Sequence, residues 1–269
     1  MSRPEPVPLH YDARGEGPGV VLVHGLYGSG NNFRRHAGWL AEQHRVLSPD
    51  LRNHGRSPHG DEMSYAAMAA DLEALLDREG LAQATLVGHS MGGKAAMALA
   101  LTRAQRVSAL VVVDIAPVAY DHDQGAILEA MESVDLARVA SRADAERQLR
   151  EAVPEAGVRQ FLLTNLERAD GGWRWRLPLG ILARAMPAIL DFPELDSRYP
   201  GPALFLHGKQ SDYVSPEHHD IIRRGFPEAR IEGLEGVGHW VHAEAPDAFE
   251  SALREFLGQA PPASGGTGC

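Results

Sequence analysis

A serine flanked by small residues offers the first chemistry in this chain, in the run Gly88-His89-Ser90-Met91-Gly92. The run directly follows an apolar stretch typical of a buried strand and precedes a helical pattern. A sharp turn between a strand and a helix exposes a serine hydroxyl, and flanking glycines let the two backbones approach closely. The spacing therefore predicts that Ser90 is a nucleophile for acyl transfer.

The base that would activate this serine is expected late in the chain. A serine hydroxyl is unreactive at neutral pH until a neighbouring base takes its proton, and in chains with a serine at such a turn the histidine comes last. The stretch EGVGHWVH offers His239 and His242. We expect His239 to be the base, because Gly236 and Gly238 favour a loop that reaches the site. His242 falls in or near the following helix.

The donors for a developing oxyanion are expected on two backbone segments. Acyl transfer places negative charge on an oxygen, which backbone N–H groups stabilise. The segment HGLYGSGNNF follows an apolar run, and its glycines let it bend back over the nucleophile. The sequence therefore predicts an oxyanion hole made by the amides of Leu26 and Met91.

The elements that must position these groups are short apolar runs that alternate with longer helical patterns. The runs cover residues 19–25, 44–50, 84–90, 108–117 and 202–208. Near-continuous Val, Leu and Ile predicts strands buried on both faces, as in a parallel sheet covered by helices. The expected fold class is α/β, with ligands bound beyond the carboxyl ends of the strands. The motifs lie at those ends.

The alternation stops after Pro117 and resumes near residue 200, and the intervening text is mostly helical. An insertion of this length over the strand ends would act as a lid. Trp173 and Trp175 lie in it, and they either line an acyl pocket or simply pack within the lid. The expected organisation is core 1–116, lid 117–200, core 201–258 and a flexible, Gly- and Pro-rich tail 259–269.

Composition limits the classes of partner. A formal net charge of -10 disfavours a broad basic surface for nucleic acids or anionic membranes. The single cysteine, Cys269, excludes an intrachain disulfide and a cysteine metal cluster. No window approaches the ~18 consecutive apolar residues of a membrane span, and the first residues lack a signal-like apolar core. We expect a cytoplasmic protein without a membrane span.

The same motifs resemble those of the α/β-hydrolase superfamily: HGLYGSG for the oxyanion loop, GHSMGG for the nucleophile and GHW for the histidine. A closer resemblance is to small bacterial esterases of the YbfF type and their mitochondrial abhydrolase relatives. It is carried by DLRNHGRSPH, GHSMGGKAAM, VVVDIAPV and HHDIIRRGFP. The resemblance spans nearly the whole chain apart from its tail. It implies an α/β-hydrolase fold with a mostly parallel sheet and a helical lid inserted late in the sheet.

The acid that orients the histidine has two candidates under this resemblance. The wider superfamily usually carries it three residues after a glycine that ends the late strand. Counting from Gly208 gives Ser211, with Asp212 one residue out of register. The YbfF-type pattern carries an aspartate at the end of an earlier strand, here Asp114, and a serine at the late position. We expect Asp114 to be the acid, with Asp212 as the alternative and Ser211 as a supporting hydrogen-bond partner near His239.

The resemblance implies a serine hydrolase that cleaves carboxylic esters, or acyl thioesters, through an acyl-enzyme on Ser90. Such chemistry requires no metal or cofactor, and the expected partner is a small-molecule acyl ester or thioester rather than a nucleic acid. The serine argues against dehalogenases and epoxide hydrolases of this fold, which use an aspartate. It leaves open a carbon-carbon bond hydrolase, a cofactorless lyase or a hydrolase-fold receptor. The oligomeric state stays open.

Overall fold

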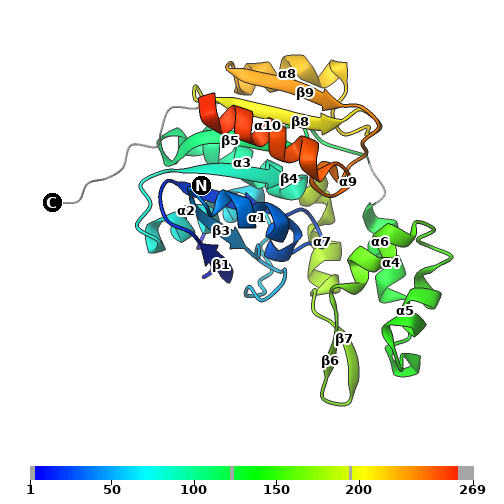
Figure 1. Cartoon of the computed structure of the whole chain (residues 1–269). Helices are drawn as coiled ribbons and strands as arrows, with labels where there is room; N and C mark the ends of the chain where they lie inside the picture. The colour runs from blue at the N-terminus through cyan, green and yellow to red at the C-terminus, as the bar shows by residue number, and fades with distance from the viewer. Residues whose placement is uncertain (1–3, 122–123, 194–195, 260–269) are drawn as a thin grey trace.

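The computed structural model describes residues 4–121, 124–193 and 196–259, and its centre is a seven-stranded sheet in the order β1-β3-β2-β4-β5-β8-β9 (Figure 1). Only β1 pairs antiparallel, with β3, and the other neighbours in this sheet are parallel. The strands are β1 (Tyr11–Arg14), β2 (Gly19–Val23), β3 (Arg45–Pro49), β4 (Ala84–His89), β5 (Val107–Val113), β8 (Ala203–Gly208) and β9 (Ala229–Leu234). The predicted mostly parallel sheet is confirmed. Its two outermost strands, β1 and β9, were not among the predicted runs.

Helices cover both faces of this sheet. Successive side chains of a strand point to opposite faces, so the apolar side chains on each face need a layer of helices to bury them. Val21 and Val23 pack in one core cluster with α2 (Tyr65–Arg78), α3 (Met91–Thr102) and α8 (His219–Gly225). Val20 and Leu22 pack in a second cluster with α1 (Arg34–Leu40) and α10 (Pro246–Gln259). The prediction that the sheet is covered on both faces is therefore confirmed.

The insertion, residues 117–200, leaves the sheet after β5 and returns before β8. Figure 1 shows it in green beside the ends of the central strands, with the β6–β7 hairpin projecting away from the sheet. It contains α4 (Gln124–Glu132), the short 3-10 helix Leu136–Arg138, α5 (Arg142–Leu149), α6 (Ala156–Leu163), β6 (Leu166–Ala169), β7 (Gly172–Trp175) and α7 (Leu179–Leu190). The hairpin is an addition to the helices expected from the sequence.

The two connections of the insertion are joined to each other and to the core. The amide of Tyr120, where the insertion begins, donates to the carbonyl oxygen of Leu190 at 3.0 Å. The ammonium of Lys94, on α3, donates to the carbonyl oxygens of Leu190 and Asp191 at 2.8 Å each. The insertion is thus anchored one helical turn below the predicted nucleophile.

The predicted tail, 259–269, falls almost wholly outside the described residues, as does Cys269. Gln259, expected to begin that tail, instead ends α10. Within the described residues, no helix is long and apolar enough to cross a membrane.

Candidate active site

Ser90 occupies a one-residue turn between β4 and α3, with backbone angles of φ 52° and ψ -121°. A non-glycine residue with positive φ is uncommon and persists only where its surroundings enforce it. The backbones around this turn pass so close together that only glycine fits. A Cβ added at Gly92 would lie 2.4 Å from the carbonyl oxygen of His24, and a Cβ added at Gly88 would lie 2.4 Å from the carbonyl oxygen of Gly92. The glycines around Ser90 are therefore required by backbone packing, as the motif predicted.

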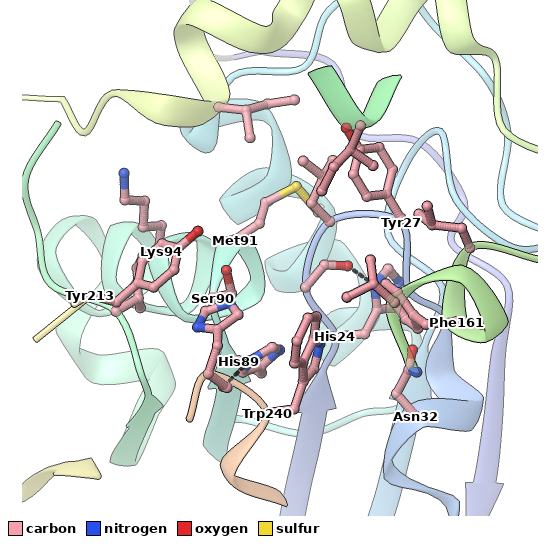
Figure 2. A pocket seen from close by; sticks show the side chains of 18 of the residues that line it. His24, Tyr27, Asn32, His89, Ser90, Met91, Lys94, Phe161, Tyr213 and Trp240 are labelled. Carbon is pink, nitrogen blue, oxygen red and sulfur yellow. Dashed lines mark hydrogen bonds between the residues drawn. The ribbon is translucent and has the colours of Figure 1, made fainter. Parts of the chain in front are cut away.

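A cavity of about 330 Å³ surrounds the Ser90 side chain and extends between the core and the insertion. Figure 2 shows Ser90 in this cavity with Met91, Tyr213 and Trp240. The lining is mostly apolar, and the insertion contributes part of it. Its contributors from the insertion include Ile127, Val153, Val158, Phe161, Ile189 and Leu190. An apolar group attached to a reacting carbonyl would fit this environment.

His239 follows β9 and lines the same cavity, with its ring held by Asp114. The Nδ1 of His239 lies 2.7 Å from Oδ2 of Asp114, which is fully buried directly after β5. The same carboxylate accepts from the Ser211 hydroxyl at 2.5 Å and, through Oδ1, from the Gly208 amide at 3.0 Å. The hydrogen bonds to Asp114 thus come from two segments. One is the loop after β9, which carries His239, and the other is the end of β8 and the turn that follows it, which carry Gly208 and Ser211.

Asp212 is not part of this arrangement. Its side chain is exposed and it is absent from the cavity lining. Ser211, one residue earlier, instead turns its hydroxyl towards Asp114. The structure therefore brings His239, Asp114 and Ser211 together and leaves Asp212 outside.

Two further side chains hold the His239 segment in place, and neither was among the predicted site residues. Tyr213 stacks on the imidazole of His239, with ring centres 4.1 Å apart and 22° between the planes. The Nε2 of His89 donates to the carbonyl oxygen of His239 at 3.0 Å. Burial, followed by the charges of His239 and His242, lowers the pKa of His89 well below its ordinary value, so His89 is a neutral donor. In the sequence, the only feature that indicates this role of His89 is its position next to Ser90.

His242 also lines the cavity, but it contacts no carboxylate among the described residues. Burial is the main reason that its pKa is lowered to about 3, with smaller contributions from His36 and His239. Its ring stacks on Phe33 at 4.6 Å, and its Nδ1 has no hydrogen-bond partner among the described residues. A neutral, buried imidazole of this kind is a packing residue.

The predicted oxyanion donors, Leu26 and Met91, both line the cavity. Gly25 lets the first loop approach the nucleophile, because a Cβ there would lie 3.2 Å from that of Ser90. Met91 begins α3, so its N–H is one of the helix-start amides that lack an intrahelical acceptor. Within the described residues the Leu26 amide has no acceptor either. Both amides are thus available to an external oxygen.

Trp173 and Trp175 lie on the β6–β7 hairpin, outside the cavity lining. The indole of Trp175 donates to the carbonyl oxygen of Met131 at 2.9 Å, and the guanidinium of Arg168 lies 4.4 Å from the Trp173 ring centre. These contacts favour packing within the insertion, the second of the two roles expected for these residues, over a place in the acyl pocket. Phe161 and Trp240 supply aromatic lining instead, with ring centres 6.3 Å apart.

Lys94 also lines the cavity, although only 2% of its surface is exposed. Burial lowers its pKa from 10.5 to about 7, and the nearby Asp191 partly opposes this shift. Its hydrogen bonds go to the two carbonyl oxygens at the end of α7 rather than to a carboxylate.

Among the described residues, no group of three His, Cys, Asp or Glu side chains is placed to hold a metal ion.

Comparisons with known proteins agree with this fold. Residues 18–246 match the family described as alpha/beta hydrolase fold. The sn-1-specific diacylglycerol lipase ABHD11 of Mus musculus is 46% identical over 94% of this chain and 86% of its own length. Esterase YbfF of Escherichia coli K12 is 42% identical over 88% of this chain and 92% of its own length. A solved marine microorganism esterase superposes with a TM-score of 0.90 at 37% identity, over 93% of this chain and all of that one. The resemblance predicted from the motifs is confirmed.

Proposed function

The chain belongs to the α/β hydrolase fold family and is a carboxylesterase-type serine hydrolase, and on that premise we propose that Ser90, His239 and Asp114 form its catalytic triad. The observation that carries the proposal is the 2.7 Å contact between His239 and Asp114 beside a cavity that also contains Ser90. No other described carboxylate contacts this imidazole.

The contact to Asp114 determines which nitrogen of His239 is the base. An ionised carboxylate only accepts hydrogen bonds, so the proton of the neutral imidazole lies on Nδ1 and Nε2 is free. Nε2 takes the Ser90 proton as the hydroxyl oxygen attacks the acyl carbonyl, and then gives it to the leaving alcohol. Asp114 orients the ring and stabilises its positive charge without becoming protonated.

The tetrahedral intermediate carries its negative charge on the former carbonyl oxygen, where the amides of Leu26 and Met91 donate to it. Its collapse leaves an acyl group on Ser90. Water, activated by His239, attacks this acyl-enzyme and releases the carboxylic acid with the serine restored. Apart from the ester and the water, the groups assigned to both halves of the reaction belong to the chain.

The cavity favours esters with an apolar acyl group of short to medium length. Its volume of about 330 Å³ is at the small end of ligand pockets, which span roughly 300 to 1,000 Å³. Acyl thioesters are attacked by the same route and belong to the proposed substrate class. The name of the mouse relative makes diacylglycerol a second candidate, in which the insertion would have to admit a larger lipid.

The insertion is proposed to be a lid, since it contributes cavity residues such as Phe161 and Leu190 and lies beside the strand ends (Figure 1).

The cytoplasmic location stays a prediction from the sequence, and fractionation of the source cells would test it.

A p-nitrophenyl ester series from acetate to palmitate, run on the wild-type protein and on Ser90→Ala, tests the proposal. Turnover is expected to peak at short or medium chains and to vanish in the variant. Wild-type turnover that Ser90→Ala leaves intact on every ester would contradict it. A diacylglycerol in mixed micelles, assayed on the same two proteins, tests the second candidate.

A further inference from the structure

The loop of residues 24–28 carries a proposed oxyanion donor on a peptide unit whose orientation is fixed from its other end. The Leu26 amide and the Gly25 carbonyl belong to one planar trans peptide, so the two groups point in opposite directions. The Gly25 oxygen accepts from the Nδ1–H of His24 at 2.7 Å and from the Gly28 amide at 3.0 Å. Holding this oxygen therefore sets the direction of the Leu26 N–H.

The hydrogen bonds of His24 assign its tautomer. The amide of Leu51 donates to Nε2 of His24 at 3.0 Å, so Nε2 carries no proton and Nδ1 does. Complete burial is the main cause that lowers the pKa of His24, so the ring stays neutral at pH 7. The contacts that hold the His24 ring, and through it the Gly25 oxygen, therefore come from the core and not from the insertion.

The next residue, Tyr27, has a φ of 62° and depends on outside contacts to keep it. Its amide donates to Nε2 of His54 at 3.1 Å, and its carbonyl oxygen accepts from Nδ2 of Asn165 at 2.8 Å. His54 is a second neutral, buried imidazole, with Nδ1 donating to the carbonyl oxygen of Arg52 at 3.0 Å. The two peptide groups that flank the Tyr27 α-carbon are thus held from opposite sides, one by the core and one by the insertion.

Asn165 lies between α6 and β6 of the insertion and is only 3% exposed. Its side-chain nitrogen also lies 3.3 Å from the carbonyl oxygen of Leu162, at the end of α6. Because this atom faces two carbonyl oxygens, it must be the NH₂ group and not the amide oxygen. One side chain therefore ties the end of α6 to a loop 138 residues earlier in the chain.

We propose that Asn165 is a positioning residue that couples docking of the insertion to the geometry of the oxyanion donor at Leu26. With the insertion docked, Asn165 holds the Tyr27 carbonyl, and the N–H of the same peptide unit, that of Gly28, donates to the Gly25 oxygen and so helps to hold the peptide that carries the Leu26 N–H. With the insertion displaced, that carbonyl loses the Asn165 donor and the Tyr27–Gly28 peptide unit rotates, so the Gly25 oxygen loses the Gly28 N–H that helps to point the Leu26 N–H at the reacting oxygen. The proposal rests on the proposed function, since it assigns a control to the same site.

Coupling of this kind works in both directions. A ligand that places an anionic oxygen against the Leu26 amide favours the backbone geometry that exists in the docked state. It must therefore stabilise docking of the insertion by the same factor by which docking strengthens its binding. The insertion then closes most firmly around the transition state and its analogues, and less firmly around the ground-state ester.

The central variant is Asn165→Leu, which keeps the size of the side chain and removes its donor. Its kcat on p-nitrophenyl acetate is expected to fall by about 10- to 100-fold with KM within about threefold, because misplacing a catalytic group by about 1 Å costs up to ~10²-fold. Affinity for a trifluoromethyl ketone, whose hemiketal with Ser90 carries an oxyanion, should fall by the same factor as kcat/KM.

Thr164→Ala is the matched control. The Thr164 hydroxyl donates to the carbonyl oxygen of Phe161 at 2.6 Å, at the end of the same helix, and the side chain is exposed. This variant weakens the end of α6 without touching the 24–28 loop, so its kcat should stay within about twofold of wild type. Equal losses in Thr164→Ala and Asn165→Leu would assign the effect to the helix end and overturn the proposal.

Folded Asn165→Leu with wild-type kcat and ketone affinity would also overturn it. If the variant does not fold, hydrogen exchange on the wild-type protein decides: the ketone should slow exchange in residues 24–28 and in 160–166 together. Protection confined to 24–28 contradicts the coupling.

Ser90→Ala separates this proposal from the proposed function. Ester turnover retained in Ser90→Ala refutes the triad. An inactive Ser90→Ala together with a fully active Asn165→Leu refutes only the coupling.

Discussion

The Nδ1 of His239 lies 2.7 Å from Oδ2 of Asp114, although 125 residues separate them in the chain. Asp212, much nearer to His239 in sequence, is exposed and takes no part in the contact. Replacement of Asp114 by asparagine should therefore lower kcat by up to ~10⁴-fold, because the imidazole would adopt the wrong tautomer. Asp212→Asn should keep near-normal kinetics. The reverse result in ester assays would return the acid role to Asp212.

Ser211 is expected to matter less than Asp114 but measurably. Removing a hydrogen bond to a charged group typically costs about 1.5 to 3 kcal/mol, and Gly208 and His239 still hold the carboxylate. Ser211→Ala should therefore lower kcat/KM by roughly 10-fold, since each 1.4 kcal/mol is a factor of ten. Ser215→Ala, in the same segment but without a contact to Asp114, should behave as wild type. A fully active Ser211→Ala enzyme would leave the serine with a structural role only.

Phe161 and Trp173 should separate cavity lining from packing of the insertion. Phe161→Ala enlarges the cavity and should raise KM for butyrate and hexanoate esters several-fold while the acetate ester changes little. Trp173→Ala should leave KM for all three esters unchanged and lower the melting temperature, because its ring packs within the insertion. Steady-state kinetics and thermal unfolding of both variants check this. A change in chain-length preference caused by Trp173→Ala would restore it to the acyl pocket.

Lys94 should make the free energy of unfolding increase with pH above neutrality. Its pKa is about 7 in the folded protein and ordinarily 10.5, so between these values the unfolded chain holds a proton that the folded chain has released. Stability therefore rises over this window, with a slope of up to ~1.4 kcal/mol per pH unit from this one group. Urea unfolding of the wild type and Lys94→Met at pH 7, 8 and 9 measures the slope. Equal slopes in the two proteins would contradict the assignment.

His242 should contribute to acid unfolding. Its pKa of about 3 in the folded protein, against 6.5 ordinarily, means that between pH 6.5 and 3 only the unfolded chain binds the proton. Stability is lost as the pH falls through this range, again by up to ~1.4 kcal/mol per unit. His242→Leu should flatten the dependence between pH 6 and 4. His59→Leu, which replaces an exposed histidine in the same way, serves as the control.

Features that depend on neighbouring residues could be predicted from the sequence. The turn at Ser90 follows from glycines within two positions on each side, whose backbones must pass within a few ångströms of other backbone atoms. Helix α2 begins after Ser64, whose hydroxyl accepts from the Ala67 amide, and ends before Gly80, which has a φ of 66°. The central strands are continuous apolar runs because both of their faces are buried. These signals are local, so the pattern contains them.

Side-chain direction across elements could be predicted only in part. A register argument from the family pattern favoured Asp114 and left Asp212 as an alternative. The contact itself depends on β5 and β8 being neighbours in the sheet, with the Gly208 and Ser211 segment folded over the end of β5. Trp173 illustrates the opposite limit, because an aromatic side chain in an inserted segment has no local feature that distinguishes cavity lining from packing.

By itself, the sequence determined the α/β sheet and predicted the serine at its turn and the late histidine, because apolar runs, glycine spacing and the order of motifs along the chain are all properties of the sequence. Only the tertiary structure decided which carboxylate meets His239, that His89 holds the His239 carbonyl, and that Asn165 reaches the carbonyl of Tyr27. These contacts join residues more than a hundred positions apart. Their geometry depends on strand order and on how the insertion folds back, and no short stretch of sequence specifies either.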